Sequence, residues 1–181
     1  MDTKVRSLVA LNVVGGSAVL ASYVVGLGAV PGDALWGGVP DSIRPLYTVN
    51  MFFAAAGYFF FTAYILFRLD SGTTRVAGRF GYGIFHLFYA LVLFPSALWL
   101  PLTALMAEQP GLASWVSVRI DLALVAFGAL GLLASLISLG PGAPKGRRLA
   151  IAGLVPFCLQ TVVLDALVWP AFFPFSAHYF G

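Results

Sequence analysis

Five long apolar stretches alternate with short polar gaps along the chain. At about 1.5 Å of helical rise per residue, each stretch is long enough to cross a hydrocarbon core of about 30 Å. We therefore predict an all-α membrane protein, a bundle of five transmembrane helices in a single domain covering residues 1–181. The predicted spans are residues 8–30, 46–67, 82–106, 122–139 and 149–173.

The positive charges orient these spans. Of the 10 Lys and Arg residues, all but Arg44 and Arg119 lie at residues 4–6, 68–79 and 145–148. Positive residues collect on the cytoplasmic side of membrane proteins, so we expect a cytoplasmic N-terminus and an outside C-terminus, in a bacterial inner membrane. The first stretch has the basic start of a signal peptide, but its apolar run is longer than such peptides use, which favours a retained span.

Composition excludes an ordinary soluble domain. Apolar residues make up 60% of the chain, charged residues 9%, and the mean hydropathy is +0.94, whereas about a quarter of the residues in soluble domains are charged. The net charge of +3 comes from the residues that set the topology. We therefore expect membrane lipids as partners and no nucleic acid.

No catalytic or metal-binding constellation is visible. Cys158 is the only cysteine and lies within a span, which excludes a disulfide and favours a buried apolar role. His86 and Asp165 fall near opposite ends of their spans, so they do not form an acid–base pair. We assign no catalytic residue and no metal ligand, and an enzymatic role stays open.

Polar residues within the spans mark the candidate interior. Asp165 is the most unusual, because a carboxylate at the centre of a membrane helix costs about 2.5–3.5 kcal/mol unless it faces a polar interior, pairs or takes a proton. Gln160, Thr161 and Asp165 are expected on one face, either as a packing network or as the wall of a ligand pocket. Tyr47 and Asn50 share a face of the second span, and Asn50 should point into the bundle.

Four further expectations concern local structure. Residues 31–45, rich in proline and glycine, form a long outer loop in which Trp36 is either an interfacial anchor or a ligand contact. Pro95 should kink the third span. Asp121 is expected beside Arg119 in the first turn of the fourth span, at the outer interface. Gly128 and Gly131 of that span mark a close helix contact.

Three segments resemble the TspO/MBR family, the tryptophan-rich sensory or translocator proteins. The segments are WGGVPDSIRPLYTVNMFFAAAGY at 36–58, RIDLALVAFGALG at 119–131 and RRLAIAGLVPFCLQTVVLDALVW at 147–169. The family has further tryptophans where this loop keeps Trp36, Asn-Trp where Phe88 and Tyr89 stand, and Asn at the position of Asp165.

The resemblance implies a pocket between the helices, closed on one side by the first loop. It implies binding of a hydrophobic planar molecule such as a porphyrin, a sterol or a related lipid, commonly by a homodimer. No cofactor is required on this reading, and a bound tetrapyrrole is the candidate ligand. The positions that map to the pocket are Trp36, Tyr47, Asn50, Tyr89, Thr161 and Asp165.

Two other function classes remain open beside a binding protein or sensor. The small residues of the first and fourth spans and the aromatic surfaces also suit a structural or accessory subunit of a larger membrane complex. A third reading is an enzyme that acts on a lipid or tetrapyrrole, with Asp165 transferring a proton.

Overall fold

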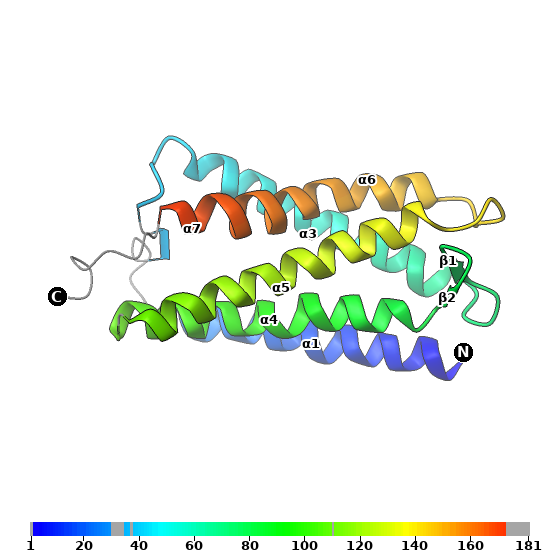
Figure 1. Ribbon diagram of the computed structural model, residues 1–181, viewed down its shortest axis with the longest axis horizontal. Helices are drawn as coiled ribbons and strands as arrows, with labels where there is room; N and C mark the ends of the chain where they lie inside the picture. The colour runs from blue at the N-terminus through cyan, green and yellow to red at the C-terminus, as the bar shows by residue number, and fades with distance from the viewer. Residues whose placement is uncertain (1, 30–34, 37, 110, 173–181) are drawn as a thin grey trace.

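Five long helices run side by side along the molecule in the computed structural model, which describes residues 2–29, 35–36, 38–109 and 111–172 (Figure 1). All five are long and apolar enough to cross a membrane, as an integral membrane protein requires, so the predicted five-helix bundle is confirmed. The helices are α1 Thr3–Ala29, α3 Arg44–Phe67, α4 Ile84–Glu108, α5 Leu112–Ile137, and a last span made of α6 Arg147–Cys158, the π-helix η1 Leu159–Val168 and α7 Trp169–Ala171.

The start of the fourth span differs from the prediction. Helix α5 begins at Leu112, well before the predicted residue 122, so Asp121 does not lie in its first turn. Asp121 is buried, and Arg119 lies over the Trp115 ring at 3.5 Å and donates to the carbonyl of Pro170 at 2.9 Å. The two polar residues interrupt the apolar run in the sequence, but helix α5 continues through both of them.

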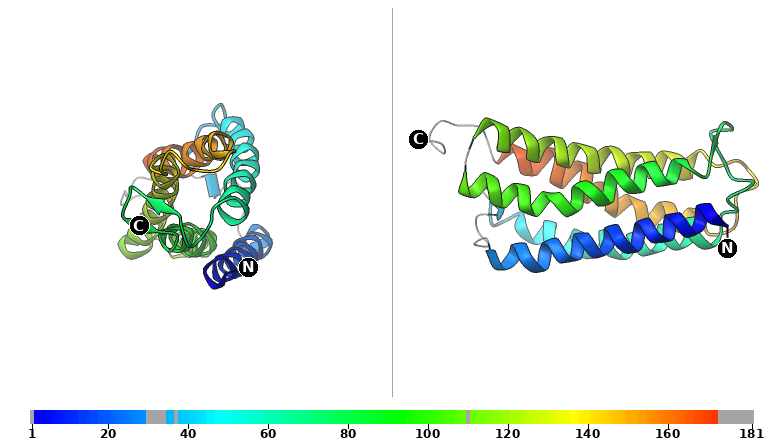
Figure 2. Two further views of the ribbon diagram at one scale, coloured as in Figure 1. Left: turned by 90° about the vertical axis from the view of Figure 1, so that its right-hand side faces the viewer. Right: turned by 90° about the horizontal axis from the view of Figure 1, so that it is seen from below.

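The helices pack in the order α1, α4, α5, last span, α3, with α1 at the edge of the bundle next to α4 (Figure 2). Only 11% of the membrane-length window of α1 is buried. A helix with so much apolar surface left uncovered is expected to face lipid. Its most exposed large side chains are those of Val13, Val14, Leu20, Val24 and Val25.

Glycines set the closest helix contacts. A Cβ atom on Gly57 of α3 would overlap the carbonyl oxygen of Gly153 in α6. A Cβ on Gly128 of α5 would lie 2.9 Å from the carbonyl oxygen of Phe88, and one on Gly131 would overlap the Phe88 ring. The expected close contact at Gly128 and Gly131 is therefore confirmed, with α4 as the partner.

Backbone pairing joins two loops at the end of the bundle that holds Lys4. Strands β1 (Arg75–Val76) and β2 (Phe80–Gly81) form an antiparallel hairpin that sequence analysis did not foresee. Val76 also bridges to Leu139, and the amide of Ala77 donates to the carbonyl of Ser138 at 3.0 Å. The hairpin after α3 is thus tied to the end of α5.

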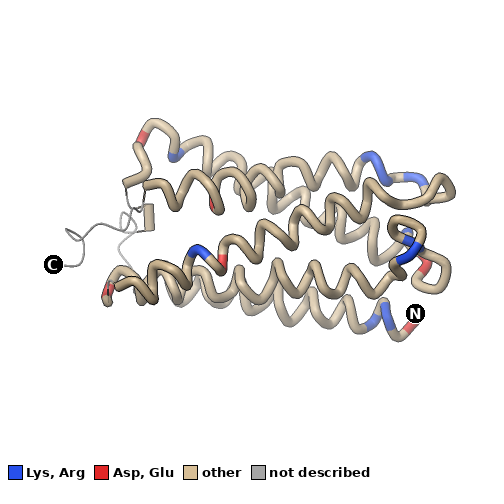
Figure 3. Tube along the Cα trace, in the orientation of Figure 1, with Lys and Arg blue, Asp and Glu red and all other residues tan. Residues whose placement is uncertain are grey.

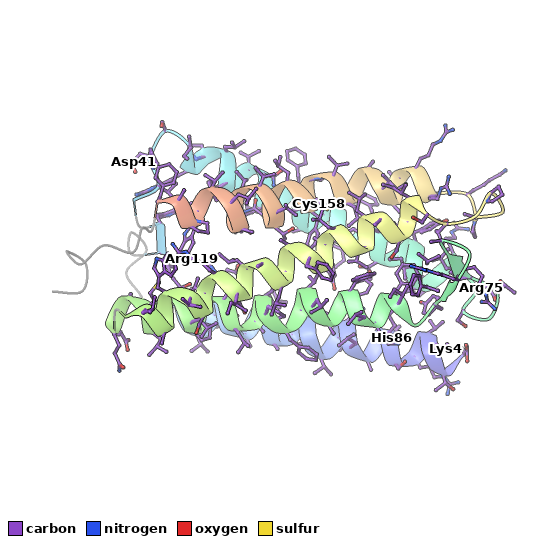
Figure 4. The ribbon with its side chains drawn as sticks, viewed as in Figure 1. Lys4, Asp41, Arg75, His86, Arg119 and Cys158 are labelled. Atoms are coloured by element: carbon purple, nitrogen blue, oxygen red, sulfur yellow. The ribbon has the colours of Figure 1, made fainter. Side chains whose placement is uncertain are left out.

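The charges are unequally divided between the two ends of the bundle. Most Lys and Arg residues lie at the end that holds the N-terminus (Figure 3). We call this the Lys4 end, and the opposite one, where Asp41 and Arg119 lie, the Arg119 end (Figure 4).

Candidate functional site

The last span changes its hydrogen-bonding pattern where it enters the Arg119 end. Helix α6 contains Pro156, which has no N–H to donate, and from Leu159 the chain continues as a π-helix. Such helices close their turns between residues five apart, as in the bond from the Trp169 amide to the Leu164 carbonyl. They are rare and occur frequently at functional sites.

The wide turn brings two polar side chains together. Gln160 and Asp165 are five residues apart, a spacing that an α-helix does not place on one face. In η1 the Gln160 amide donates from Nε2 to Oδ1 of Asp165 at 2.8 Å, so their expected shared face is confirmed. Thr161 is buried, and its hydroxyl donates to the Phe157 carbonyl of its own helix at 2.9 Å.

Helix α3 supplies the matching polar groups. Asn50 donates from Nδ2 to Oε1 of Gln160 and to the carbonyl of Pro156, both at 3.0 Å. The Tyr47 hydroxyl donates to the Leu164 carbonyl at 2.8 Å. Both residues are buried, which confirms that they share an inward face. One chain of hydrogen bonds therefore runs from Asn50 through Gln160 to Asp165.

Aromatic rings from different elements surround the same region. Trp36 packs edge-on against Tyr47, with ring centroids 5.7 Å apart. Tyr23 of α1 lies 6.0 Å from Trp99 of α4, which lies 6.3 Å from Trp169 of α7. Such rings provide flat apolar walls with a polar edge. Sequence reasoning had not selected Tyr23, Trp99 or Trp169 as site residues.

The first loop reaches into this end of the bundle. Leu35 and Val39 are buried, and the Leu35 carbonyl accepts a hydrogen bond from the Trp169 indole at 3.0 Å. The amide of Gly38 donates to the Phe172 carbonyl at 3.2 Å. Residues 35–36 and 38–39 thus cover the end of the helices, while residues 30–34 and 37 of the expected loop lie outside the described part.

Asp165 has no positive partner in the described part of the chain. Its only recorded hydrogen bond there comes from Gln160, and no Lys, Arg or His pairs with it. Tyr23 and Tyr47 lie close enough to interact with it electrostatically. Asp165 is partly exposed, whereas Gln160 and Tyr47 beside it are buried.

Two buried polar atoms near this site lack a hydrogen-bond partner among the described residues. They are Nε1 of Trp99 and Oδ2 of Asp121. Burying a polar group without a partner costs about 1–3 kcal/mol, so each such group calls for an explanation. The inward position of Asp121 could have been found from the sequence, because it precedes Gly128 by two helical turns and shares its face.

Tyr89 and Thr161, two of the predicted site residues, take no part in the hydrogen-bonded chain. Tyr89 is fully buried, its hydroxyl lies 2.7 Å from that of Thr62, and its ring packs against Tyr58 and Phe61. Tyr89 is about 15 Å from Trp99 along α4, at about 1.5 Å per residue. It belongs to the core nearer the Lys4 end, and Thr161 is bonded within its own helix.

An apolar groove of about 410 Å³ runs along the surface between α1 and α4. It lies at the level of Tyr23 and Trp99, because residues on either side of these two form its walls. Ala21, Ser22, Gly26, Leu100, Pro101 and Ala104 line it.

His86 belongs to the opposite end of the molecule (Figure 4). Its Nε2 lies 2.8 Å from the hydroxyl of Ser7, which joins α4 to α1. His86 and Asp165 are thus apart, as expected. Among the described residues, His, Cys, Asp and Glu form no group of three that could hold a metal ion.

Comparison with protein-family models, with curated proteins and with solved structures finds no match to this chain.

Proposed function

We propose that this chain is an integral membrane binding protein or sensor, with a pocket at the Arg119 end for a hydrophobic planar ligand. Tetrapyrroles, sterols and related lipids are the candidate classes. The observation that carries the proposal is the chain of bonds from Asn50 through Gln160 to Asp165, set among rings of α1, α3, α4 and α7. Ligand sites commonly combine apolar and aromatic walls with a few convergent polar groups.

The resemblance to the TspO/MBR family supports the same assignment. It implies a pocket under the first loop, and Leu35 and Val39 of that loop are buried, with the Leu35 carbonyl bonded to Trp169 of the last span. Trp36, Tyr47, Asn50 and Asp165 are the contacts we assign, with Thr161 behind them. Tyr89 is the weakest of the mapped positions, because its hydroxyl and ring are occupied by core contacts. A homodimer is part of this proposal.

The charge distribution supports a cytoplasmic N-terminus and an outside C-terminus. Most Lys and Arg residues gather at the end of the bundle that holds the N-terminus (Figure 3), and positive residues favour the cytoplasmic side. We place the protein in a bacterial inner membrane, and the pocket would then open toward the outside.

An accessory subunit of a membrane complex is the second candidate. It is favoured by the uncovered face of α1, where Val14, Leu20 and Val24 are more than 60% exposed. Lipid suits that face equally well. A subunit would co-purify with other membrane proteins, whereas a binding protein would migrate alone or as a homodimer in mild detergent.

A porphyrin-binding measurement tests the first candidate. The protein in nanodiscs is titrated with protoporphyrin IX, and binding is followed by tryptophan quenching and by the absorbance of the porphyrin. We expect saturation at micromolar porphyrin, with weaker binding by Asp165→Asn and Trp36→Phe. Asp41→Asn is the matched control, because Asp41 is 88% exposed and pairs with Arg44 at the surface. If porphyrin, a sterol and a planar dye all fail to saturate, the protein is not a receptor of this kind.

A further inference from the structure

We propose that the ligand of this pocket is an organic cation, a flat aromatic amine held by Asp165 between aromatic rings. This inference rests on the proposed binding function and narrows it from a planar ligand to a positively charged one. It follows from three properties of the site. Its carboxyl groups have no positive partner among the described residues, they lie at a similar depth in the bundle, and aromatic rings surround them.

Asp165 and Asp121 have no positive counterpart among the described residues. Asp165 accepts from a neutral amide, and Oδ2 of Asp121 has no partner. Arg119, two residues before Asp121, makes other contacts. It donates to the Pro170 and Trp115 carbonyls and lies over the Trp115 ring. A membrane carboxylate is normally paired or held in a polar interior. A bound cation would supply the positive partner that these carboxyl groups lack among the described residues.

The two carboxyl groups lie at one depth of the bundle. Helix α5 and the last span run antiparallel, and two contacts fix their register. The Cys158 thiol lies 3.6 Å from the Ala129 carbonyl, and Arg119 bonds to the Pro170 carbonyl. Asp121 and Asp165 both fall between these contacts, eight residues from Ala129 and seven from Cys158 respectively. Two acidic groups therefore lie at a similar level of the bundle.

Aromatic rings complete the chemistry of a cation site. Tyr23 of α1 and Tyr47 of α3 approach Asp165 from two other helices, and Trp99 and Trp36 extend these walls. The faces of tryptophan and tyrosine rings attract cations, and aromatic cages are the usual receptors for quaternary and methylated ammonium groups. A planar amine can stack on such walls while its positive end meets Asp165.

Other charged occupants fit less well. A ligand whose negative group lay beside Asp165 would find no positive partner there among the described residues. A hard metal ion requires several oxygen ligands, whereas Oε1 of Gln160 is engaged by Asn50 and no group of three metal-binding side chains occurs among the described residues. A flat organic cation uses both the acid and the aromatic rings.

Three dyes of one shape and different charge test the inference. The full chain in phosphatidylcholine nanodiscs is titrated with 9-aminoacridine, a planar cation, with neutral anthracene and with anionic 9-anthracenecarboxylate. Empty nanodiscs give the background from lipid partitioning. We expect the cation to bind at least tenfold more tightly than the other two. Asp165→Asn should reduce that preference at least tenfold, while Asp41→Asn should behave as wild type.

The outcomes separate this inference from the proposed function. If anthracene or its carboxylate binds as tightly as the cation to the wild-type protein, the cation assignment is wrong and the receptor proposal stands. If no dye and no porphyrin binds, both are wrong. The wild-type preference requires no variant, so misfolding of Asp165→Asn would not obscure it. Tyr23→Phe and Tyr23→Leu add a second test, because only the leucine variant should lose the preference.

Discussion

Asn50 of α3 donates a hydrogen bond to Gln160 of η1 at 3.0 Å, and Gln160 in turn donates one to Asp165 at 2.8 Å. The side-chain amides of Asn50 and Gln160 therefore connect two spans. Because Asn50 bonds to Oε1 of Gln160, the Nε2 group of Gln160 is oriented toward Asp165. The position of the carboxyl group consequently depends on a residue of another helix that does not touch it.

Asn50→Leu should destabilise the bundle and release Gln160. Polar bonds between membrane helices contribute about 0.6 kcal/mol on average and up to about 1.7 kcal/mol, and we expect a loss in this range. Unfolding in mixed micelles of a mild detergent and dodecyl sulfate measures it. Thr48→Ala is the control, because Thr48 is exposed and bonds only to the Arg44 carbonyl of its own helix. An equal loss in both variants would contradict the assigned role.

Gly57→Ala should separate α3 from α6. The added Cβ would overlap the Gly153 carbonyl oxygen. This oxygen belongs to the backbone of α6, so it cannot move aside as the end of a flexible side chain could. Overpacking of this kind costs about 1–3 kcal/mol, which should appear as a lower Tm in detergent. Gly16→Ala is matched in chemistry but has no atom within 4 Å of its new Cβ. It should keep or slightly raise the Tm, since alanine favours the helix.

Acid should loosen the Lys4 end. The Ser71 hydroxyl donates to the carboxylate of Asp2 and lowers the pKa of Asp2 below its usual 3.8. Hydrogen bonds from Thr73 lower the pKa of Asp70 in the same way. Because the folded state favours the charged forms, this stabilisation is complete above the unfolded pKa and is lost as the pH falls through the lowered folded values. The Tm should therefore fall from pH 5 to pH 3, and Ser71→Ala should reduce that fall.

Single cysteines should report the orientation in the membrane. Cys158 is buried and is first replaced by alanine. In intact cells, a maleimide that cannot cross the membrane should label Asp41→Cys at the Arg119 end. It should label Gly142→Cys, in the loop after α5, only once the membrane is opened, because positive residues favour the cytoplasmic side. The reverse pattern would invert the topology and place the pocket on the cytoplasmic side.

Much of this fold could be predicted from the sequence. Long apolar runs determine the number of spans, and the polar spacing of Tyr47 and Asn50 identified their inward face. The start of α5 was missed because Arg119 and Asp121 lower the local hydropathy, although the helix continues through both residues. The β1–β2 hairpin was missed because strands of two residues have no periodicity to detect.

The site was only partly predictable for a different reason. Gln160 and Asp165 were expected on one face, but they share it because the last span becomes a π-helix, which the sequence analysis did not predict. Tyr89 looked equivalent to the site aromatics, since residue type alone does not reveal that its hydroxyl is engaged by Thr62. Trp99 could not be selected either, because residue type alone does not separate a ring of the site from an interfacial anchor.

The pairing of Val76 with Leu139 has a consequence for how the molecule sits in a bilayer. Arg75 bonds to the carbonyls of Gly72 and Thr74, and Arg147 bonds to the carbonyl of Leu139. The Arg75 guanidinium is thus held by the turn before β1, and the Arg147 guanidinium by the residue that pairs with Val76. Interfacial arginines anchor membrane helices and help to set their tilt. We therefore expect the Lys4 end to anchor the bundle in the headgroup layer and to help set its tilt in the bilayer.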